Sequence, residues 1–366
     1  MKKQLTANQV SNIVLLCSVG LKIAILPGYM SSIANKDFWL VTLVMTIFEL
    51  LSYIAILEVA KKIPNKTFFQ VLEDNFNFPI RKIVEILFFI FFILKTILNI
   101  YECENFIKET IYEDFNEWIF LPVFLLFVIY VANKDFNVLG RSSELVVYLA
   151  YSAMIISLML SIIDIDISNI LPIMPNGVVP LFKCSAKSSF WFGDYLIFLL
   201  LMGNIKYEKG SSRKIIGGYI ITISFIVLYF ITFNCLFNNT TPIRNTAISD
   251  VSHYIPHLND FRLDWLSDIL WVFVELFTSA IWFFMAKIIF CNLFGIDNKN
   301  KIVSFSFAGV IILLMNVLQL PINKYVTFLG TYCVWITGVM SLTPLFIIYC
   351  YKIGKRRKYY ENALEK

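Results

Sequence analysis

A glycine and a charged residue occur together in two long apolar runs of the sequence. The first run, at about residues 10–29, contains Gly20 and Lys22, and a later run contains Gly193 directly before Asp194. Glycine weakens a helix, and a lysine at the depth of a bilayer costs about 2.5–3.5 kcal/mol on insertion scales. We therefore expect each pair to mark an interruption of a membrane-spanning helix.

An interrupted helix can form a binding site because its free backbone groups need partners. The N–H groups at a half-helix N-terminus can hold a carboxylate, and free carbonyl groups can hold an ammonium or a cation. In this interpretation Lys22 pairs with an acid from the other half of the chain, with Asp194 as the first candidate and Glu275 as the second. Alternatively, Gly20 and Gly193 allow close helix packing and Lys22 extends toward the membrane surface.

Polar residues on three other apolar segments have helical spacing, which places each set on one face of a helix. The sets are Glu49, Ser52 and Tyr53; Lys95, Asn99 and Glu102; and Glu275, Thr278, Ser279 and Trp282. Lipid does not tolerate such faces, so they point into the bundle. They either line one polar cavity or pair with each other as structural contacts.

These patterns predict one ligand-binding site at the two interruptions. Its candidate residues are Gly20, Leu21, Lys22, Asn99, Glu102, Phe192, Gly193, Asp194, Glu275, Thr278 and Ser279.

The sequence contains no arrangement typical of an enzyme or a metal centre. His253 and His257, the two histidines, are four residues apart, but Pro256 lies between them. The seven cysteines are scattered without a C-x-x-C spacing, as expected of small apolar packing residues. We expect no enzymatic activity, no cofactor and no bound metal.

The composition is that of a polytopic membrane protein. Hydrophobic residues make up 58% of the 366 residues and charged residues 16%, and the mean hydropathy is +0.72, which excludes an ordinary soluble domain. We predict a single integral membrane domain, residues 1–366, and no cleavable signal peptide. The ten predicted spans are at about 9–29, 38–60, 83–107, 117–132, 142–163, 188–204, 215–237, 263–294, 302–320 and 326–351.

The distribution of basic residues predicts the orientation. Of the 31 lysines and arginines, 21 fall on the side of the N-terminus and 7 on the other side. The positive-inside rule then places both termini in the cytoplasm, including the basic tail 352–366. The net charge of +5 is therefore no sign of nucleic-acid binding.

A loop rich in proline divides the spans into two groups of five. It reads "DIDISNILPIMPNGVVPLFKCSAKS" and cannot form a long regular helix. Two groups of five spans, each beginning with an interrupted helix, favour an inverted repeat, with the first repeat at about 9–163 and the second at about 178–352. Between spans 2 and 3, "KTFFQVLEDNFNFPIRK" is predicted to be a short amphipathic segment at the membrane surface.

Several motifs along the chain resemble the B subunits of GerA-type spore germinant receptors, a branch of the amino acid–polyamine–organocation permease superfamily. They are "LTANQV", the "G....ILP" of residues 20–27, "ANKDFWL", "AKKIPNKTFFQVLE", "FIK", "ILPIMPNGVVPLFK", "FWFGDYLIFLLL" and "FRLDWLSDILWVF". The last two are the most specific when they occur together.

This resemblance implies a permease-like subunit that binds a small nutrient, often an amino acid, in the inner membrane of a dormant spore. It would signal through an A subunit and a lipoprotein C subunit. Relatives usually have small or hydroxyl residues where this chain has Leu21 and Lys22, and glutamate where it has Asp194, which leaves the ligand open. Two alternatives remain: an amino-acid secondary transporter, coupled to protons or with Lys22 replacing a coupling cation, and a scaffold subunit with a degenerate pocket.

Overall fold

A computed structural model describes residues 4–112, 117–254, 263–298, 300–318 and 321–352. These residues are almost entirely helical, and the extended pairing among them is an isolated bridge between Leu5 and Ile205. The helices are α1 (Ala7–Gly20), α2 (Leu26–Ala34), α3 (Phe38–Lys62), α4 (Phe68–Asn75), α5 (Phe78–Thr110), α6 (Glu117–Ala132), α7 (Phe136–Ser161), α8 (Val179–Ser188), α9 (Tyr195–Leu201), α10 (Ser211–Phe237), α11 (Ala247–Ser252), α12 (Leu263–Phe294), α13 (Lys301–Leu318), α14 (Ile322–Tyr332) and α15 (Val334–Ser341).

The helices confirm a polytopic α-helical membrane protein. Among the described residues, six segments are long and apolar enough to cross a membrane: Leu26–Lys62, Phe78–Thr110, Phe136–Asp164, Ser211–Ile243, Asp264–Phe294 and Val334–Lys352. Ile119–Ala132 and Lys301–Asn316 are shorter apolar helices. The count of ten spans and the inverted repeat stay predictions, because the expected first and sixth spans are divided into short helices.

The segment predicted to be amphipathic contains α4. Thr67 and Gln70 form a capping box at its N-terminus, and Phe68, Val71 and Leu72 on one face are buried. As predicted, the proline-rich loop forms no long regular helix: it contains the 3₁₀ helix Ile167–Ile170 and then α8, which begins at Val179 with Pro180 in its first turn. Proline is tolerated there because its missing N–H would have no helical partner.

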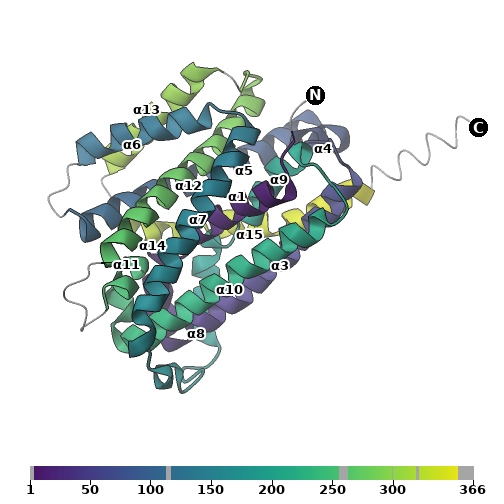
Figure 1. Ribbon diagram of the computed structural model, residues 1–366. Helices are drawn as coiled ribbons and strands as arrows, with labels where there is room; N and C mark the ends of the chain where they lie inside the picture. Colours follow the sequence, from purple (N-terminus) through teal and green to yellow (C-terminus); the bar gives the residue numbers. More distant parts are fainter. Residues whose placement is uncertain (1–3, 113–116, 255–262, 299, 319–320, 353–366) are drawn as a thin grey trace, which may run out of the picture.

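Helix α1 lies in the middle of the bundle (Figure 1). It packs against α7, α9, α10 and α12, while α12 packs along α5 and α7. Nearly every residue of α1 and all seven residues of α9 are buried, as expected of helices that are apolar on all faces. The two short helices that border the interruptions are therefore enclosed by the longer ones.

Candidate functional site

Both predicted interruptions are present in the structure. Helix α1 ends at Gly20, and regular helix resumes at Leu26 in α2. At the second interruption, a 3₁₀ turn ends at Trp191 and α9 begins at Tyr195. Phe192, Gly193 and Asp194 therefore lie between the 3₁₀ turn and α9.

The two glycines also permit close packing. A Cβ atom on Gly20 would lie 3.0 Å from the side chain of Thr278 in α12, and one on Gly193 would lie 2.8 Å from the ring of Phe91 in α5. Other residues would have to move to accommodate a larger side chain at either position. Interruption and close packing, which the sequence left as alternatives for the glycines, therefore occur together.

The charged residues of the two interruptions meet in the interior. The Lys22 ammonium donates a hydrogen bond to Asp194 Oδ2 and lies 3.1 Å from Glu49 Oε2. Lys95 Nζ lies 3.1 Å from Asp194 Oδ1, and all four side chains are fully buried. The predicted contact between Lys22 and Asp194 is confirmed. The alternative prediction, that Lys22 extends toward the membrane surface, is wrong, because Asp194 and Glu49 bind its ammonium inside the bundle.

We call Lys22, Glu49, Lys95 and Asp194 the four-charge network. It contains two ammonium groups and two carboxyl groups, so its formal charges cancel. Phe192 adds an aromatic ring whose centroid lies 5.2 Å from the Lys22 ammonium, within the range of a cation–π contact.

The network also binds the free backbone groups of the second interruption. The N–H of Asp194 donates to Glu49 Oε1 at 3.1 Å, and Lys95 Nζ donates to the carbonyl of Trp191 at 3.2 Å. The Tyr219 hydroxyl of α10 donates to Glu49 Oε2 at 2.9 Å. The protein's own carboxylate and ammonium therefore occupy the places that an interrupted helix offers to a charged ligand.

A second polar group lies between α5 and α12. Asn99 Nδ2 donates a hydrogen bond to Glu275 Oε2, and Ser279 Oγ donates to Asn99 Oδ1 at 2.7 Å. Glu102 Oε1 lies 3.5 Å from the indole N–H of Trp191. Glu275 was a wrong candidate for pairing with Lys22, because Asn99 on the facing helix binds it instead.

We call Glu102 and Glu275 the acid pair. Both are buried, and Glu102 acts electrostatically on Glu275. Among the described residues, Glu102 Oε2 and Glu275 Oε1 have no hydrogen-bond partner. The Thr278 hydroxyl lies 3.5 Å from the carbonyl of Leu16 and so faces α1.

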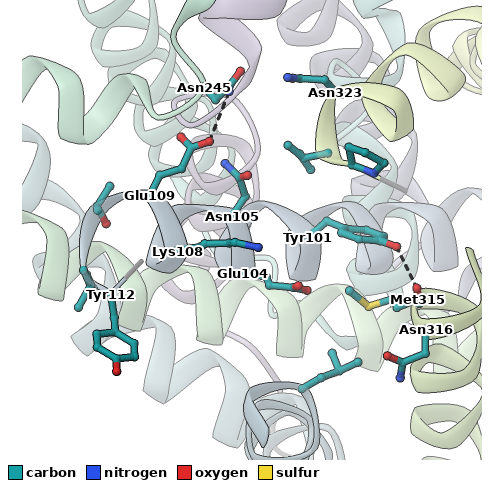
Figure 2. Close-up of a pocket in the computed structure, with 15 residues that line it drawn as sticks. Tyr101, Glu104, Asn105, Lys108, Glu109, Tyr112, Asn245, Met315, Asn316 and Asn323 are labelled. Carbon is teal, nitrogen blue, oxygen red and sulfur yellow. Dashed lines mark hydrogen bonds between the residues drawn. The ribbon is translucent and has the colours of Figure 1, made fainter. Parts of the chain in front are cut away.

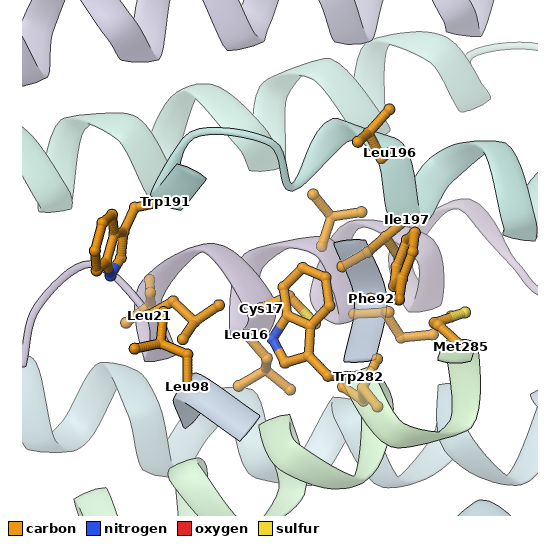
Figure 3. Close-up of a cluster of buried hydrophobic side chains, with 14 of the residues drawn as sticks. Leu16, Cys17, Leu21, Phe92, Leu98, Trp191, Leu196, Ile197, Trp282 and Met285 are labelled. Atoms are coloured by element: carbon orange, nitrogen blue, oxygen red, sulfur yellow. The ribbon is translucent and has the colours of Figure 1, made fainter. Parts of the chain in front are cut away.

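Large apolar side chains seal the region between the interruptions and α12. Figure 3 shows Leu16, Cys17 and Leu21 of the first interrupted segment beside Trp191 and Trp282. All five are buried, so Leu21 is part of this apolar packing. A cavity of about 310 Å³ lies beside the second interruption and is lined by Phe192, Gly193 and residues of α3, α5, α8 and α15.

A larger cavity of about 1080 Å³ lies at the C-terminal end of α5 (Figure 2). Its polar lining includes Glu104, Asn105, Lys108, Glu109, Asn245 and Asn323. Tyr101 lines it as well, and its hydroxyl lies 3.4 Å from the carbonyl of Met315. Sequence reasoning missed this cavity because its walls come from four helices, α5, α6, α13 and α14, and a loop that are far apart in the chain.

Sequence reasoning also left Glu49, Lys95 and Tyr219 out of the site. A signal existed for the first two, since each is a charge within an apolar segment that shares a helix face with other polar residues. For Tyr219 there was none, because a tyrosine is common in a membrane-spanning helix.

Comparison with known proteins identifies the family. Residues 4–322 match the family model described as spore germination protein. The chain belongs to this family. It is also similar to spore germination protein KB of Bacillus subtilis (strain 168), with 21% identity over 232 residues. The similarity spans 61% of this chain and 61% of that relative, so the chain covers less than two thirds of its length. The family match confirms the resemblance to spore germination proteins that the motifs predicted.

Proposed function

We propose that this chain is the B-type subunit of a nutrient germinant receptor and that it binds a small nutrient, such as an amino acid, at the two interruptions. Membership of the spore germination family supports the germination role. The observation that carries the binding role is the four-charge network. It holds a carboxyl group and an ammonium group at the positions where a zwitterion would present its own carboxylate and ammonium.

Competition would link binding to a change of state. The carboxylate of an amino acid would take the place of Asp194 and Glu49 on the Lys22 ammonium, while its amine would bind one of the released acids. A ligand shifts an equilibrium between two states only through different contacts in each. Closing the network without ligand and opening it with ligand supplies that difference.

The same proposal includes the 5+5 inverted repeat, at about 9–163 and 178–352, with both termini in the cytoplasm. Supporting it, four pairs of helices with corresponding numbers in the two halves contact each other: α1 and α9, α3 and α10, α5 and α12, and α6 and α13. Such contacts are expected where a pseudo-twofold axis passes between the halves. In this orientation the C-terminal end of α5, which lines the cavity of Figure 2, lies away from the cytoplasm, on the side from which the nutrient would enter.

The orientation can be tested with an introduced cysteine at position 358. All seven native cysteines are buried, so a membrane-impermeant thiol reagent reports on the new one. Labelling is expected only after the cytoplasmic side is exposed. Labelling of intact cells would reverse the topology.

The proposed partners are the A and C subunits of the receptor, held together in the inner membrane of the spore. Co-purification of a tagged chain with both subunits from spore membranes tests this assignment. Recovery of the chain without either subunit would contradict it.

The nutrient role is tested with spores that carry Thr278→Val and, as a matched control, Thr327→Val. Thr278 is buried against Gly20, whereas Thr327 is exposed on α14. Each strain is exposed to single amino acids after the deletion strain has shown which nutrients depend on this chain. A shifted dose–response curve for Thr278→Val alone supports the proposal, while equal curves contradict it. Accumulation of radiolabelled amino acid in vesicles would favour the transporter instead.

A further inference from the structure

In the part of the chain that the structure describes, no cation is paired with either member of the acid pair. Glu102 and Glu275 are 3% and 0% exposed, and neither belongs to an ion pair among the described residues. Their hydrogen bonds in the described part of the chain come from the amide of Asn99 and the indole of Trp191, and the indole of Trp271 also acts on Glu275. All three groups are neutral. One oxygen of each carboxyl group is buried without a partner in the described part of the chain.

The charged groups around the pair do not supply the missing charge. The group that acts on Glu275 is Glu102, another acid, and Cys103 lies beside both. Lys95 acts on Glu102 from the side of the four-charge network. Its ammonium, however, is bound to Asp194 and to the carbonyl of Trp191.

A pair of carboxylates in this place would be very unfavourable. An ionised group taken out of water needs a counter-ion and several hydrogen bonds, and otherwise it becomes neutral. Two like charges close together add to the penalty. The described residues also offer no group of three histidine, cysteine or acidic side chains that could hold a metal ion, and neither acid lines the cavity at the end of α5 or the cavity beside the second interruption.

A proton is the cation that fits this space. We infer that Glu102 and Glu275 form a proton-binding site and that both carboxyl groups are protonated in this closed structure. The inference concerns protonation alone and does not depend on the proposed nutrient role. In this inference the protons are bound to the two unpartnered oxygens, Glu102 Oε2 and Glu275 Oε1.

The protons couple the packing of α5 and α12 to pH. When water reaches the pair, the O–H bond of each carboxyl group breaks, the proton goes to water and a carboxylate remains. Repulsion between the two carboxylates then opposes closing. The closed state binds more protons than the hydrated one, so raising the pH shifts the equilibrium toward the hydrated state.

Infrared spectroscopy of the purified full-length chain in lipid nanodiscs tests the inference, because a protonated carboxyl group has a C=O stretching band that a carboxylate lacks. The variants are Glu102→Gln, Glu275→Gln and the double substitution, with Glu49→Gln as a matched control from the four-charge network. At neutral pH each single variant should lose one component of the band and the double variant both. Glu49→Gln should leave these components unchanged.

A band that both single variants leave intact would overturn the inference. Thermal unfolding gives an independent test, since glutamine mimics a protonated glutamate. Glu102→Gln and Glu275→Gln should keep the melting temperature of the wild type, whereas Glu49→Gln should lower it. Equal losses in all three variants would show that the acid pair is ionised and would contradict the proposal.

Discussion

The four-charge network and the acid pair are both buried, and Lys95 of the network lies two turns from Glu102 of the pair on α5. Their carboxyl groups nevertheless have different kinds of partner. In the network, Glu49 and Asp194 share two ammonium groups and a backbone N–H. In the acid pair, the known partners are neutral amide and indole groups. From this comparison we expect counter-ions, and not depth alone, to decide whether a buried acid is charged. A substitution that neutralises a charge should therefore be much more destabilising in the network than in the acid pair.

The largest expected effect is that of Lys22→Met. It leaves Glu49 without an ammonium partner and Asp194 with Lys95 alone, and breaking a buried pair in this way typically costs about 3–5 kcal/mol. The corresponding change in the acid pair, Glu275→Gln, removes no counter-ion and should change stability by less than about 1 kcal/mol, the usual net contribution of a neutral hydrogen bond. Denaturant unfolding in detergent measures both, and equal losses would remove the distinction between the two regions.

A smaller effect is expected from Tyr219→Phe. The Tyr219 hydroxyl donates to Glu49, and a hydrogen bond to a charged group contributes about 1.5–3 kcal/mol. Tyr53 is a matched control, because its ring packs against Tyr219 at 5.1 Å and its buried hydroxyl has no partner among the described residues. Tyr53→Phe should be neutral or slightly stabilising. A larger loss for Tyr53→Phe than for Tyr219→Phe would show that Glu49 is not the charged centre described here.

The smallest expected effects come from the glycines beside the network. Gly193→Ala places a Cβ atom 2.8 Å from the Phe91 ring, and overpacking of this kind typically costs about 1–3 kcal/mol. Gly309 on α13 has open space around the same position, so Gly309→Ala serves as the control and should be neutral or stabilising. Unfolding of both variants under the same conditions checks the prediction. If Gly193→Ala left the free energy of unfolding unchanged, the packing between this interruption and Phe91 would be looser than described here.

The sequence predicted the parts of this account that depend on local chemistry. A lysine at membrane depth needs an acid, and Asp194, joined to a glycine in an apolar run, was a specific candidate. Long apolar runs also predicted α6 and α12 with their observed bounds. In these cases the pattern lies within one short segment of the chain.

Other features depend on how distant helices are placed, which no single segment encodes. Glu49 meets Lys22 because α3 packs against α2 and α9, which follow the two interruptions, and Glu275 meets Asn99 because α12 runs along α5. Both glutamates are acids on polar helix faces, so the sequence could not tell which of them Lys22 would bind. The large cavity at the end of α5 escaped prediction for the same reason.

A double-mutant cycle between Lys22 and Asp194 tests the central claim most directly, which is that these two residues join the interruptions through a charge pair. Lys22→Met, Asp194→Asn and the double variant are purified, and their free energies of unfolding are compared with that of the wild type. Because each single change strands a buried charge, the double variant should be more stable than the sum of the single losses predicts, by at least about 1 kcal/mol for residues in contact. Strictly additive losses would contradict the account.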